Sequence, residues 1–298
     1  MSLEASGFDL IVIGGGSAAL AGASRAAEHG ARVALLEPHL LGGTCVNVRG
    51  VPKKAMWLAA DVAGRLRLAQ TLGFDVPPAT LDWPEFIVHR ERYIANIHAS
   101  YRRRLDAAGI MVVPSFARFV DERTVECENG TLLRTRRILI ATGGRPLRPE
   151  IPGAEFGCVS DDFFQWRAAP ERVAIIGGGY IAVELAGLPQ ALGSRVDLLV
   201  RGDRLLNGFD HELAAQLAED YRQSGIRMHF GHSVAALEEK GTRVRCEDGV
   251  LGDPFDAVLF ATGRTPNSGR LQLERAGVAT DVGGHVAVGE RHASNLVG

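Results

Sequence analysis

Continuous apolar runs, each followed by a glycine turn and a helical stretch, recur along this chain. The first run covers residues 9–13 and leads into Gly14-Gly15-Gly16, a helical stretch at 18–29 and a second apolar run at 32–36, which ends at Glu37. Apolar residues at consecutive rather than alternate positions are typical of parallel strands covered on both faces. The pattern predicts a strand, a turn, a helix and a second strand.

The same unit occurs a second time. An apolar run at 172–176 meets Gly177-Gly178-Gly179, and a helical stretch at 181–192 precedes the apolar run at 195–200. A unit that appears twice at this distance predicts two domains of the same kind rather than one large domain.

Each glycine turn matches the pattern G-x-G-x-x-G/A of dinucleotide-binding units. The first small residue permits a tight turn, the second lets a pyrophosphate approach the backbone, and the third lets the helix pack closely. The helix N-terminus offers free N–H groups to the phosphates. The alternative is a glycine-rich turn in an ordinary α/β fold, but the strand before and the helix after each turn favour a nucleotide site. The matching residues are Gly14, Gly16 and Ala19, and Gly177, Gly179 and Ala182.

The predicted fold class is α/β, with two Rossmann-like dinucleotide-binding domains, the second inserted in the first. Each copy closes on a similar phrase, Ile-Leu-Ile-Ala-Thr-Gly at 138–143 and Val-Leu-Phe-Ala-Thr-Gly at 258–263. The proline-rich passage 145–153 is predicted to cross between the domains. The predicted bounds are 1–150 for the first part of the first domain, 151–265 for the second domain, and 266–298 for an incomplete return toward the first.

The two copies differ at the residue that would meet the ribose. Glu37 ends the second strand of the first copy, where a carboxylate accepts hydrogen bonds from ribose hydroxyls, as in FAD or NAD sites. Val200 has the equivalent place in the second copy, and Arg201 and Arg204 follow it. Guanidinium groups bind a 2′-phosphate, so the second site is predicted to take NADPH. Solvated surface arginines are the alternative, and Asp203 favours NADH.

Composition excludes several other functions. The 298 residues carry a formal net charge of −2, which provides no general attraction to nucleic acid or to an anionic membrane. No apolar run reaches the roughly 18 to 20 residues that span a bilayer, and the N-terminus lacks the features of a signal peptide. We expect a cytoplasmic protein with mostly reduced thiols. The four cysteines, whose spacing predicts neither a disulfide framework nor a paired-cysteine metal site, are Cys45, Cys127, Cys158 and Cys246.

Residues 42–54, Gly-Gly-Thr-Cys-Val-Asn-Val-Arg-Gly-Val-Pro-Lys-Lys, resemble the redox signature of glutathione reductases, which belong to the FAD-dependent pyridine nucleotide-disulfide oxidoreductases. The resemblance covers essentially the whole chain. It implies that NADPH reduces FAD, that FAD reduces a nearby disulfide, and that the resulting dithiol reduces a small disulfide such as glutathione disulfide. The other matching segments are 115–119, 141–146, 178–184 and 263–267.

The redox signature is altered at its second cysteine. Cys45 matches the thiol that attacks the substrate, but Gly50 stands where the thiol facing the flavin is expected, and Arg49 replaces a glycine. A single thiol cannot store two electrons as an internal disulfide. We therefore expect normal turnover to be crippled. Cys45 is then either a small apolar residue or a thiol kept reactive by Arg49.

The resemblance also implies roles for individual residues. Lys53 and Glu184 match an ion pair beside the flavin ring, and Tyr180 matches an aromatic gate that NADPH displaces. Tyr101 matches a tyrosine of the disulfide site, with helix packing as the alternative. Ser17 matches a cofactor-binding residue that also faces the substrate, with an ordinary serine of the helix turn as the alternative. Asn207 stands where relatives often carry a second phosphate-binding arginine. The cofactor-binding residues implied in addition are Gly43, Thr44, Ala141, Thr142, Gly143, Ile181 and Gly263.

The resemblance further implies segments beyond Gly298: a strand that contacts FAD, and a dimerisation domain with a His–Glu acid–base pair. Without them we expect the usual homodimer interface and the proton shuttle to be missing. Three functions remain open: an NADPH- and FAD-dependent disulfide reductase, an NADPH oxidase or diaphorase that keeps only the first half-reaction, and a non-catalytic nucleotide-binding fragment.

Overall fold

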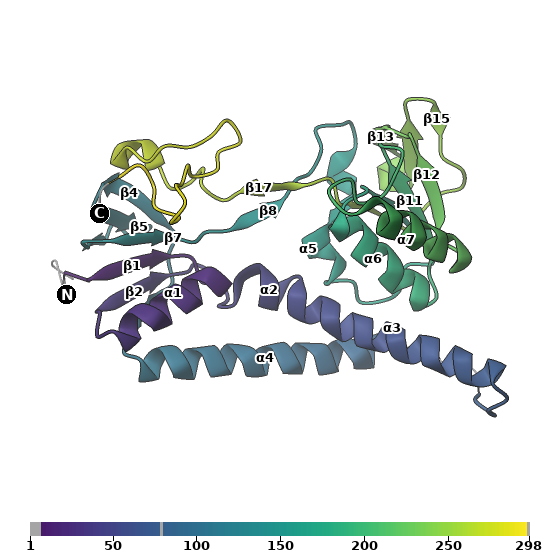
Figure 1. Ribbon diagram of the computed structural model, residues 1–298, viewed down its shortest axis with the longest axis horizontal. Coiled ribbons are helices and arrows are strands. Elements are labelled where there is room, and N and C mark those ends of the chain that lie inside the picture. Colours follow the sequence, from purple (N-terminus) through teal and green to yellow (C-terminus); the bar gives the residue numbers. More distant parts are fainter. Residues whose placement is uncertain (1–6, 78–79, 297–298) are drawn as a thin grey trace. The chain divides into compact units, whose positions relative to one another are not determined.

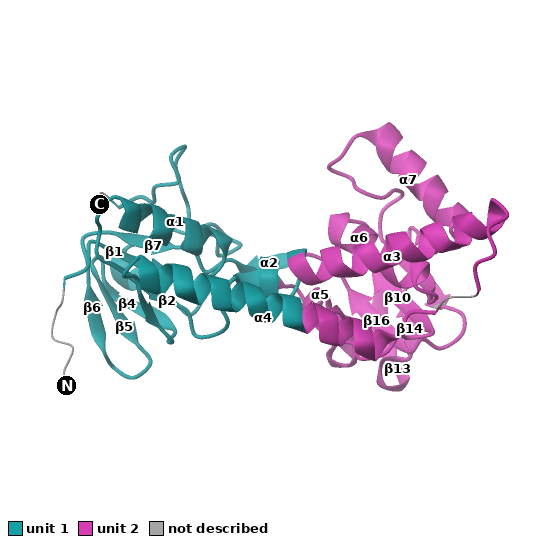
Figure 2. Cartoon of the chain, turned by 90° about the horizontal axis from the view of Figure 1, so that it is seen from below, with its two compact units in different colours: residues 1–50, 92–145, 264–298 teal, residues 51–91, 146–263 magenta. Residues whose placement is uncertain are grey.

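The computed structural model describes residues 7–77 and 80–296. The chain divides into two compact units, and each is described by itself (Figure 2). Unit 1 comprises residues 1–50, 92–145 and 264–298, and unit 2 comprises residues 51–91 and 146–263. The first six and last two residues, to which the expectations about a signal peptide and about the chain end refer, lie outside the described residues.

Unit 1 contains a four-stranded parallel sheet in the order β3-β2-β1-β7 (Figure 1). Its strands are β1 (Leu10–Ile13), β2 (Val33–Leu36), β3 (Met111–Val113) and β7 (Ile138–Ile140). Every residue of β2 is buried, as the continuous apolar run predicts. The predicted parallel sheet is therefore confirmed in this unit.

Helix α1 (Ser17–Glu28) follows β1 and is shifted by one residue from its predicted range. It buries Ala19, Leu20 and Ala23 in a cluster with residues of β1 and β2. Small alanine side chains on the buried face let a helix approach a sheet closely. The sequence Ala18 to Ala27 is rich in alanine for the same reason.

A second, antiparallel sheet completes unit 1. It consists of β4 (Ala117–Asp121), β5 (Thr124–Cys127) and β6 (Leu132–Arg134). The C-terminal part of the chain packs here: the short helix η3 (Leu273–Ala276) shares a core cluster with β4 and β5, and the backbone N–H of Phe119 donates to the carbonyl of Leu271 at 2.8 Å.

Three helices follow β2 along the chain, namely α2 (Gly43–Asn47), α3 (Gly50–Thr71) and α4 (Trp83–Ala107). Sequence continuity assigns residues 51–91 to the first domain, whereas their contacts group them with unit 2. The physical reason is burial, because Met56 of α3 and Ile87 of α4 are each at most 2% exposed in the main core of unit 2.

Unit 2 is built on a five-stranded parallel sheet in the order β12-β11-β10-β16-β9. This sheet confirms the second predicted parallel unit. Its strands are β9 (Cys158–Val159), β10 (Arg172–Ile176), β11 (Arg195–Val200), β12 (Arg227–Phe230) and β16 (Ala257–Phe260).

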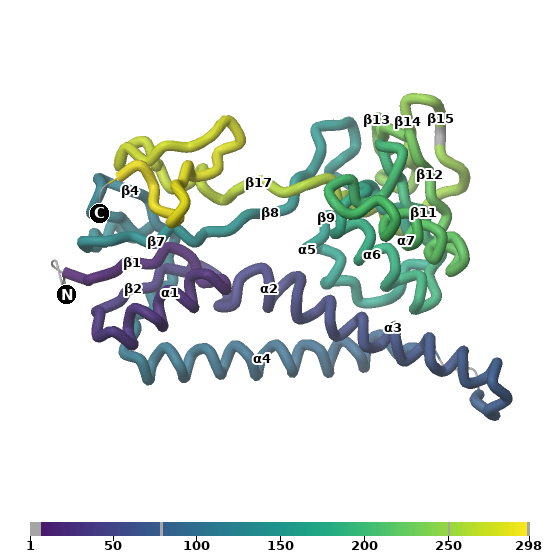
Figure 3. The backbone as a smooth tube through the Cα atoms, in the orientation of Figure 1, coloured from purple at the N-terminus to yellow at the C-terminus, as the bar shows by residue number. Residues whose placement is uncertain are grey.

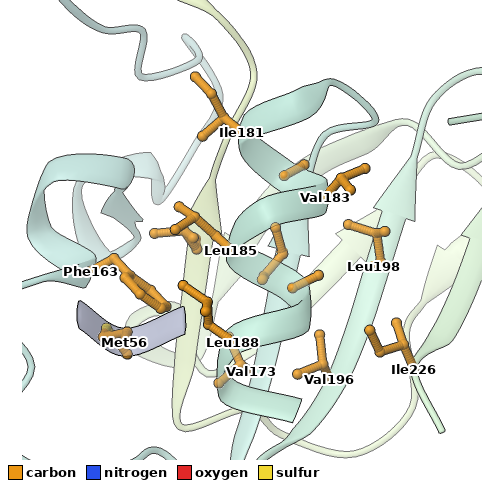
Figure 4. Close-up of a cluster of buried hydrophobic side chains, with 14 of the residues drawn as sticks. Met56, Phe163, Val173, Ile181, Val183, Leu185, Leu188, Val196, Leu198 and Ile226 are labelled. Carbon is orange, nitrogen blue, oxygen red and sulfur yellow. The ribbon is translucent and has the colours of Figure 1, made fainter. Parts of the chain in front are cut away.

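Helix α6 (Tyr180–Ala191) lays its apolar face on this sheet. Figure 4 shows Leu185 and Leu188 of α6 in the same cluster as Val173, Leu198 and Phe163. Full burial of side chains of this size stabilises a fold by about 1.5–3 kcal/mol each. The remaining elements of unit 2 are α5 (Ser160–Phe163), α7 (His211–Gln223), η1 (Ala154–Phe156), η2 (Glu239–Gly241), β13 (Val234–Glu238), β14 (Arg243–Cys246) and β15 (Gly249–Val250).

After residue 140 the chain passes from one unit to the other twice. These two segments form a two-stranded sheet of β8 (Gly144–Pro146) and β17 (Arg264–Pro266), which Figures 1 and 3 trace. The Arg145 guanidinium donates to the carbonyl of Pro266 at 2.9 Å and to the side-chain oxygen of Asn267 at 3.2 Å. The proline-rich passage predicted to cross between domains therefore begins in this ribbon.

Candidate functional site

The first glycine turn lies between β1 and α1. Gly14 has a φ of +118°, and a Cβ there would collide with the carbonyl oxygen of Ala141, so any other residue would disrupt the turn. Gly16 is the N-cap of α1, and no side chain caps the free N–H groups that follow it. Ser17, the first residue of the helix, is exposed. The turn therefore presents unpaired backbone donors to solvent, the arrangement that binds phosphate.

Glu37 lies against this turn. A Cβ on Gly15 would come 2.6 Å from the Cγ of Glu37, so the carboxylate side chain passes beside the turn at the end of β2. Its Oε1 accepts the N–H of His39 at 2.9 Å, which leaves Oε2 without a hydrogen bond from that backbone. The ribose role of Glu37 stays a prediction.

Residues of the redox signature, and residues that follow β7, border the same turn. A Cβ on Gly43, in α2, would lie 2.7 Å from the Cα of Gly16, so the two backbones are in close approach. Thr44 is the next residue of α2 and is half-buried. In the phrase after β7, the side chain of Asn267 donates to the carbonyl of Thr142 at 3.0 Å and its backbone N–H donates to Gly143 at 3.0 Å.

The second glycine turn repeats this geometry in unit 2. Gly177 has a φ of +142°, and a Cβ there would collide with the carbonyl oxygen of Ala261. Gly179 caps α6, and nothing lies within 4 Å of a Cβ placed on it. The Ala-Thr-Gly segment that recurs in the sequence has the same contact in both units, because its alanine carbonyl lies against the first glycine of the turn.

The residue beside the second turn is apolar. A Cβ on Gly178 would come 2.6 Å from a methyl group of Val200, which has the place that Glu37 takes in unit 1. Arg201 is exposed directly after β11. The Arg204 guanidinium donates to the side-chain oxygen and to the backbone carbonyl of Asn207, both at 3.1 Å. Asn207 therefore holds a predicted phosphate-binding arginine in place, a role that its sequence position did not indicate.

Lys53 and Glu184 are brought together as the resemblance implies. Lys53 lies in the first turn of α3 and Glu184 in the first half of α6, and Nζ and Oε1 are 2.7 Å apart. Their side chains are 32% and 40% exposed, so the pair contributes at most about 1 kcal/mol to stability.

The other predicted residues of α6 have different surroundings. Tyr180, the first residue of the helix, is 50% exposed. Ile181 is 8% exposed and its side chain packs in the core cluster of unit 2, so the cofactor contact that the resemblance implies for it stays a prediction. Gly263, at the end of the second Ala-Thr-Gly phrase, accepts the backbone N–H of Leu147 at 2.9 Å.

Tyr101 lies on α4 and is partly buried against the cluster of unit 1 that contains Leu105. This contact is the helix packing that the sequence left open as the alternative to a substrate role. His98, which lies on the same helix, was not identified from the sequence. His98 Nε2 is 2.7 Å from the side-chain oxygen of Asn47. The side-chain amide of Asn47 in turn donates to the carbonyl of Leu40 at 3.0 Å. Burial lowers the pKa of His98. The pair holds the end of α2, and no local signal connects residues so far apart in sequence.

The redox segment places Cys45 and Gly50 side by side. Cys45 is exposed in α2, Gly50 begins α3, and a Cβ on Gly50 would lie 2.7 Å from the Sγ of Cys45. In a disulfide the Cβ of one residue lies about 3 Å from the Sγ of the other, given an S–S bond of about 2.05 Å. The backbone is thus arranged for a disulfide, and only the second sulfur is missing.

Two parallel α/β sheets, each with a glycine turn at the start of its helix, define a two-unit α/β protein with the features of dinucleotide binding. The chain belongs to the pyridine nucleotide-disulphide oxidoreductase family, whose model matches residues 8–298. Among the described residues, no helix combines the length and hydrophobicity needed to cross a membrane.

Curated relatives include three glutathione reductases. The chain is 38% identical over 307 residues to that of Yarrowia lipolytica, covering 97% of this chain and 65% of the relative. It is 39% identical over 278 residues to that of Nostoc, covering 91% of this chain and 60% of the relative. It is 40% identical over 284 residues to that of Schizosaccharomyces pombe, covering 92% and 61%. The chain therefore spans less than two thirds of the length of these relatives.

A solved structure with the same fold is the HOCl-induced flavoprotein disulfide reductase RclA from Escherichia coli. The TM-score is 0.85 at 25% identity, and the match covers 96% of this chain and 63% of that one.

Proposed function

We propose that this chain is a flavoprotein of the glutathione reductase type, which binds FAD at the glycine turn of unit 1 and NADPH at that of unit 2. The observation that carries the proposal is the doubled turn, with Glu37 beside the first and Val200 and Arg201 beside the second. The domain assignment follows: unit 1 contains the first part of the FAD-binding domain, and unit 2 contains the NADPH-binding domain.

The residues present fit both nucleotides. The N-caps Gly16 and Gly179 leave backbone donors free for a pyrophosphate, and the space around Gly179 is open within 4 Å. FAD, when bound, supplies the two-electron chemistry that connects NADPH to a disulfide. Glu37 binds a ribose, Arg201 and Arg204 bind a 2′-phosphate, and the resemblance assigns the Lys53–Glu184 pair to the flavin ring.

The proposed substrate is a small disulfide, namely glutathione disulfide, as the names of the relatives suggest. Cys45 is exposed and is the thiol that would attack it. Because Gly50 provides no resolving thiol, we expect release of the mixed disulfide to be slow. We also propose a cytoplasmic location, which cell fractionation tests.

A second candidate, an NADPH oxidase or diaphorase, is favoured by Gly50 alone. It keeps hydride transfer and dispenses with the disulfide, so electrons would pass to a dye or to oxygen.

The proposal is tested by the visible spectrum of the chain mixed with FAD, before and after anaerobic NADPH. A protein-bound flavin band that bleaches supports both nucleotide sites. No bound flavin, with correctly folded chain, contradicts the proposal. Dye reduction and glutathione-disulfide reduction, measured on the same sample, then separate the two candidates: dye reduction alone favours the diaphorase.

Removal of either Arg201 or Arg204 is expected to weaken NADPH binding selectively. Each charge-assisted contact to a phosphate contributes roughly 1.5–3 kcal/mol, so Arg201→Ala and Arg204→Ala should each raise the Kd for NADPH about 10- to 100-fold. The Kd for NADH should stay unchanged. Titration calorimetry measures both, with Arg222→Ala as the control, because Arg222 is an exposed arginine of the same unit paired with Glu219 at 3.2 Å. Equal losses for NADH and NADPH would refute the 2′-phosphate role.

A further inference from the structure

His232, Cys246 and Asp248 form a cluster of three different side chains in unit 2, near the hairpin of β13 and β14 labelled in Figure 3. The backbone N–H of Glu247 donates to the carbonyl of Ser233 at 3.0 Å. In an antiparallel pair this bond places His232 opposite Asp248, with Cys246 two residues before Asp248 on the same face.

The three side chains each direct one donor atom into a common space. His232 Nδ1 is 3.0 Å from a carboxylate oxygen of Asp248, and all three donor atoms lie within 4.8 Å of one another. Around a tetrahedral zinc ion such atoms are about 3.5 Å apart, given Zn–N and Zn–S distances of about 2.0 and 2.3 Å. Small side-chain rotations close the difference. We infer that His232, Cys246 and Asp248 bind a borderline-soft divalent metal ion, for which Zn²⁺ is the fitting representative.

The donor set selects the metal. A thiolate and an imidazole favour Zn²⁺ over Mg²⁺ or Ca²⁺, which prefer oxygen ligands alone. The thiolate and the carboxylate together carry two negative charges, so a divalent cation makes the site neutral and buries no net charge. Three protein ligands leave the fourth tetrahedral position for water.

Burial shows how an ion would enter. Cys246 is 3% exposed, while the side chains of His232 and Asp248 are 31% and 62% exposed. The ion therefore approaches from solvent and meets the thiol at the edge of the core. Burial, with a further contribution from the charge of Asp248, raises the pKa of Cys246. Binding then forms the metal–sulfur bond and releases the thiol proton to water, and no redox change is involved.

The chain contains its own comparison in unit 1. Cys127 ends β5 in the sequence Val-Glu-Cys-Glu-Asn-Gly, which parallels Val-Arg-Cys-Glu-Asp-Gly around Cys246, and it is also 3% exposed. Near it the Ser115 hydroxyl accepts the N–H of Glu128 at 2.9 Å, where the second copy has a histidine. Among the residues that the structure describes, no other group of three histidine, cysteine or acidic side chains converges in this way.

The test is cobalt binding to the whole chain. Co²⁺ substitutes for Zn²⁺ and shows a thiolate charge-transfer band with intense visible bands in tetrahedral sites. The parent is Cys45→Ser, which removes the exposed thiol that would bind cobalt by itself. We expect one Co²⁺ per chain with the thiolate band, displaced by Zn²⁺. Cys246→Ser should abolish the band, and the matched control Cys127→Ser should keep it.

Variants at the two exposed ligands keep the test valid if the substitution of the buried Cys246 prevents folding. His232→Gln and Asp248→Asn should keep the parent's circular dichroism and weaken Co²⁺ binding more than about tenfold, since even changes to residues behind a ligand cost that much. Zn²⁺ should raise the Tm of the parent and leave that of His232→Gln unchanged. No thiolate band in the parent, or a band that survives both Cys246→Ser and His232→Gln, overturns the inference. The test is independent of nucleotide binding.

Discussion

The Gly50→Cys variant is expected to form a disulfide with Cys45 and to gain NADPH-dependent disulfide reduction. The Cβ position on Gly50 lies 2.7 Å from Cys45 Sγ, and that sulfur is the tip of a rotatable side chain, so a few tenths of an ångström of movement produces disulfide geometry. Electrons from NADPH then have an internal disulfide to reduce, and the resulting dithiol can resolve a mixed disulfide.

An aromatic disulfide whose leaving thiol has a low pKa is the suitable substrate, because such a thiol departs without a proton donor. The measured activity should rise from background to steady turnover, and the oxidised variant should keep only the three other thiols titratable. Gly64→Cys is the matched control: Gly64 lies in the same helix, with nothing within 4 Å of an added Cβ. A Gly50→Cys variant with five free thiols after oxidation would show that the geometry of the redox segment is wrong.

The Gly177→Ala variant is expected to abolish NADPH binding while unit 1 keeps its nucleotide site. Gly177 has a φ of +142° and its added Cβ collides with the carbonyl of Ala261, so the turn that presents the helix N-terminus must rearrange. The Kd for NADPH should rise by at least about 100-fold, comparable with the loss of roughly 3 kcal/mol of phosphate contacts. Flavin absorbance should persist, but NADPH should no longer bleach it.

Gly193→Ala is the control in the same unit, because it introduces backbone strain without a steric collision. Gly193 has a φ of +107°, but nothing lies within 4 Å of a Cβ there. This variant should lose about 1–2 kcal/mol of stability and bind NADPH normally. If both variants bind NADPH like the parent chain, the second glycine turn is not the nucleotide site.

Local patterns predicted the two parallel sheets because the residues that determine each strand, turn and helix lie close together in the sequence. A continuous apolar run, a glycine that needs a positive φ and a helix behind it lie within thirty or so residues, and the pairing of β10 with β11 follows directly. The exchange of Glu37 for Val200 is also visible in sequence, since each follows a recognisable strand. These features depend on backbone sterics and on burial, which the residue types express locally.

Long-range packing decided features that local sequence patterns do not determine. Residues 51–91 group with unit 2 because Met56 and Ile87 are buried there. Tyr101 packs against a core, which is one of the two roles that the sequence left open for it. Asn207 orients Arg204, a role that no sequence signature indicates.

By itself, the sequence determined the α/β class, the doubled nucleotide turn, the family resemblance and the missing second cysteine. Only the tertiary structure decided that Gly50 borders Cys45 and that His232 reaches Cys246 and Asp248. The physical reason is that turns and strands are encoded by neighbouring residues, whereas side-chain donors converge through chain folding and register. A register shift of one residue would have turned His232 and Cys246 to opposite faces.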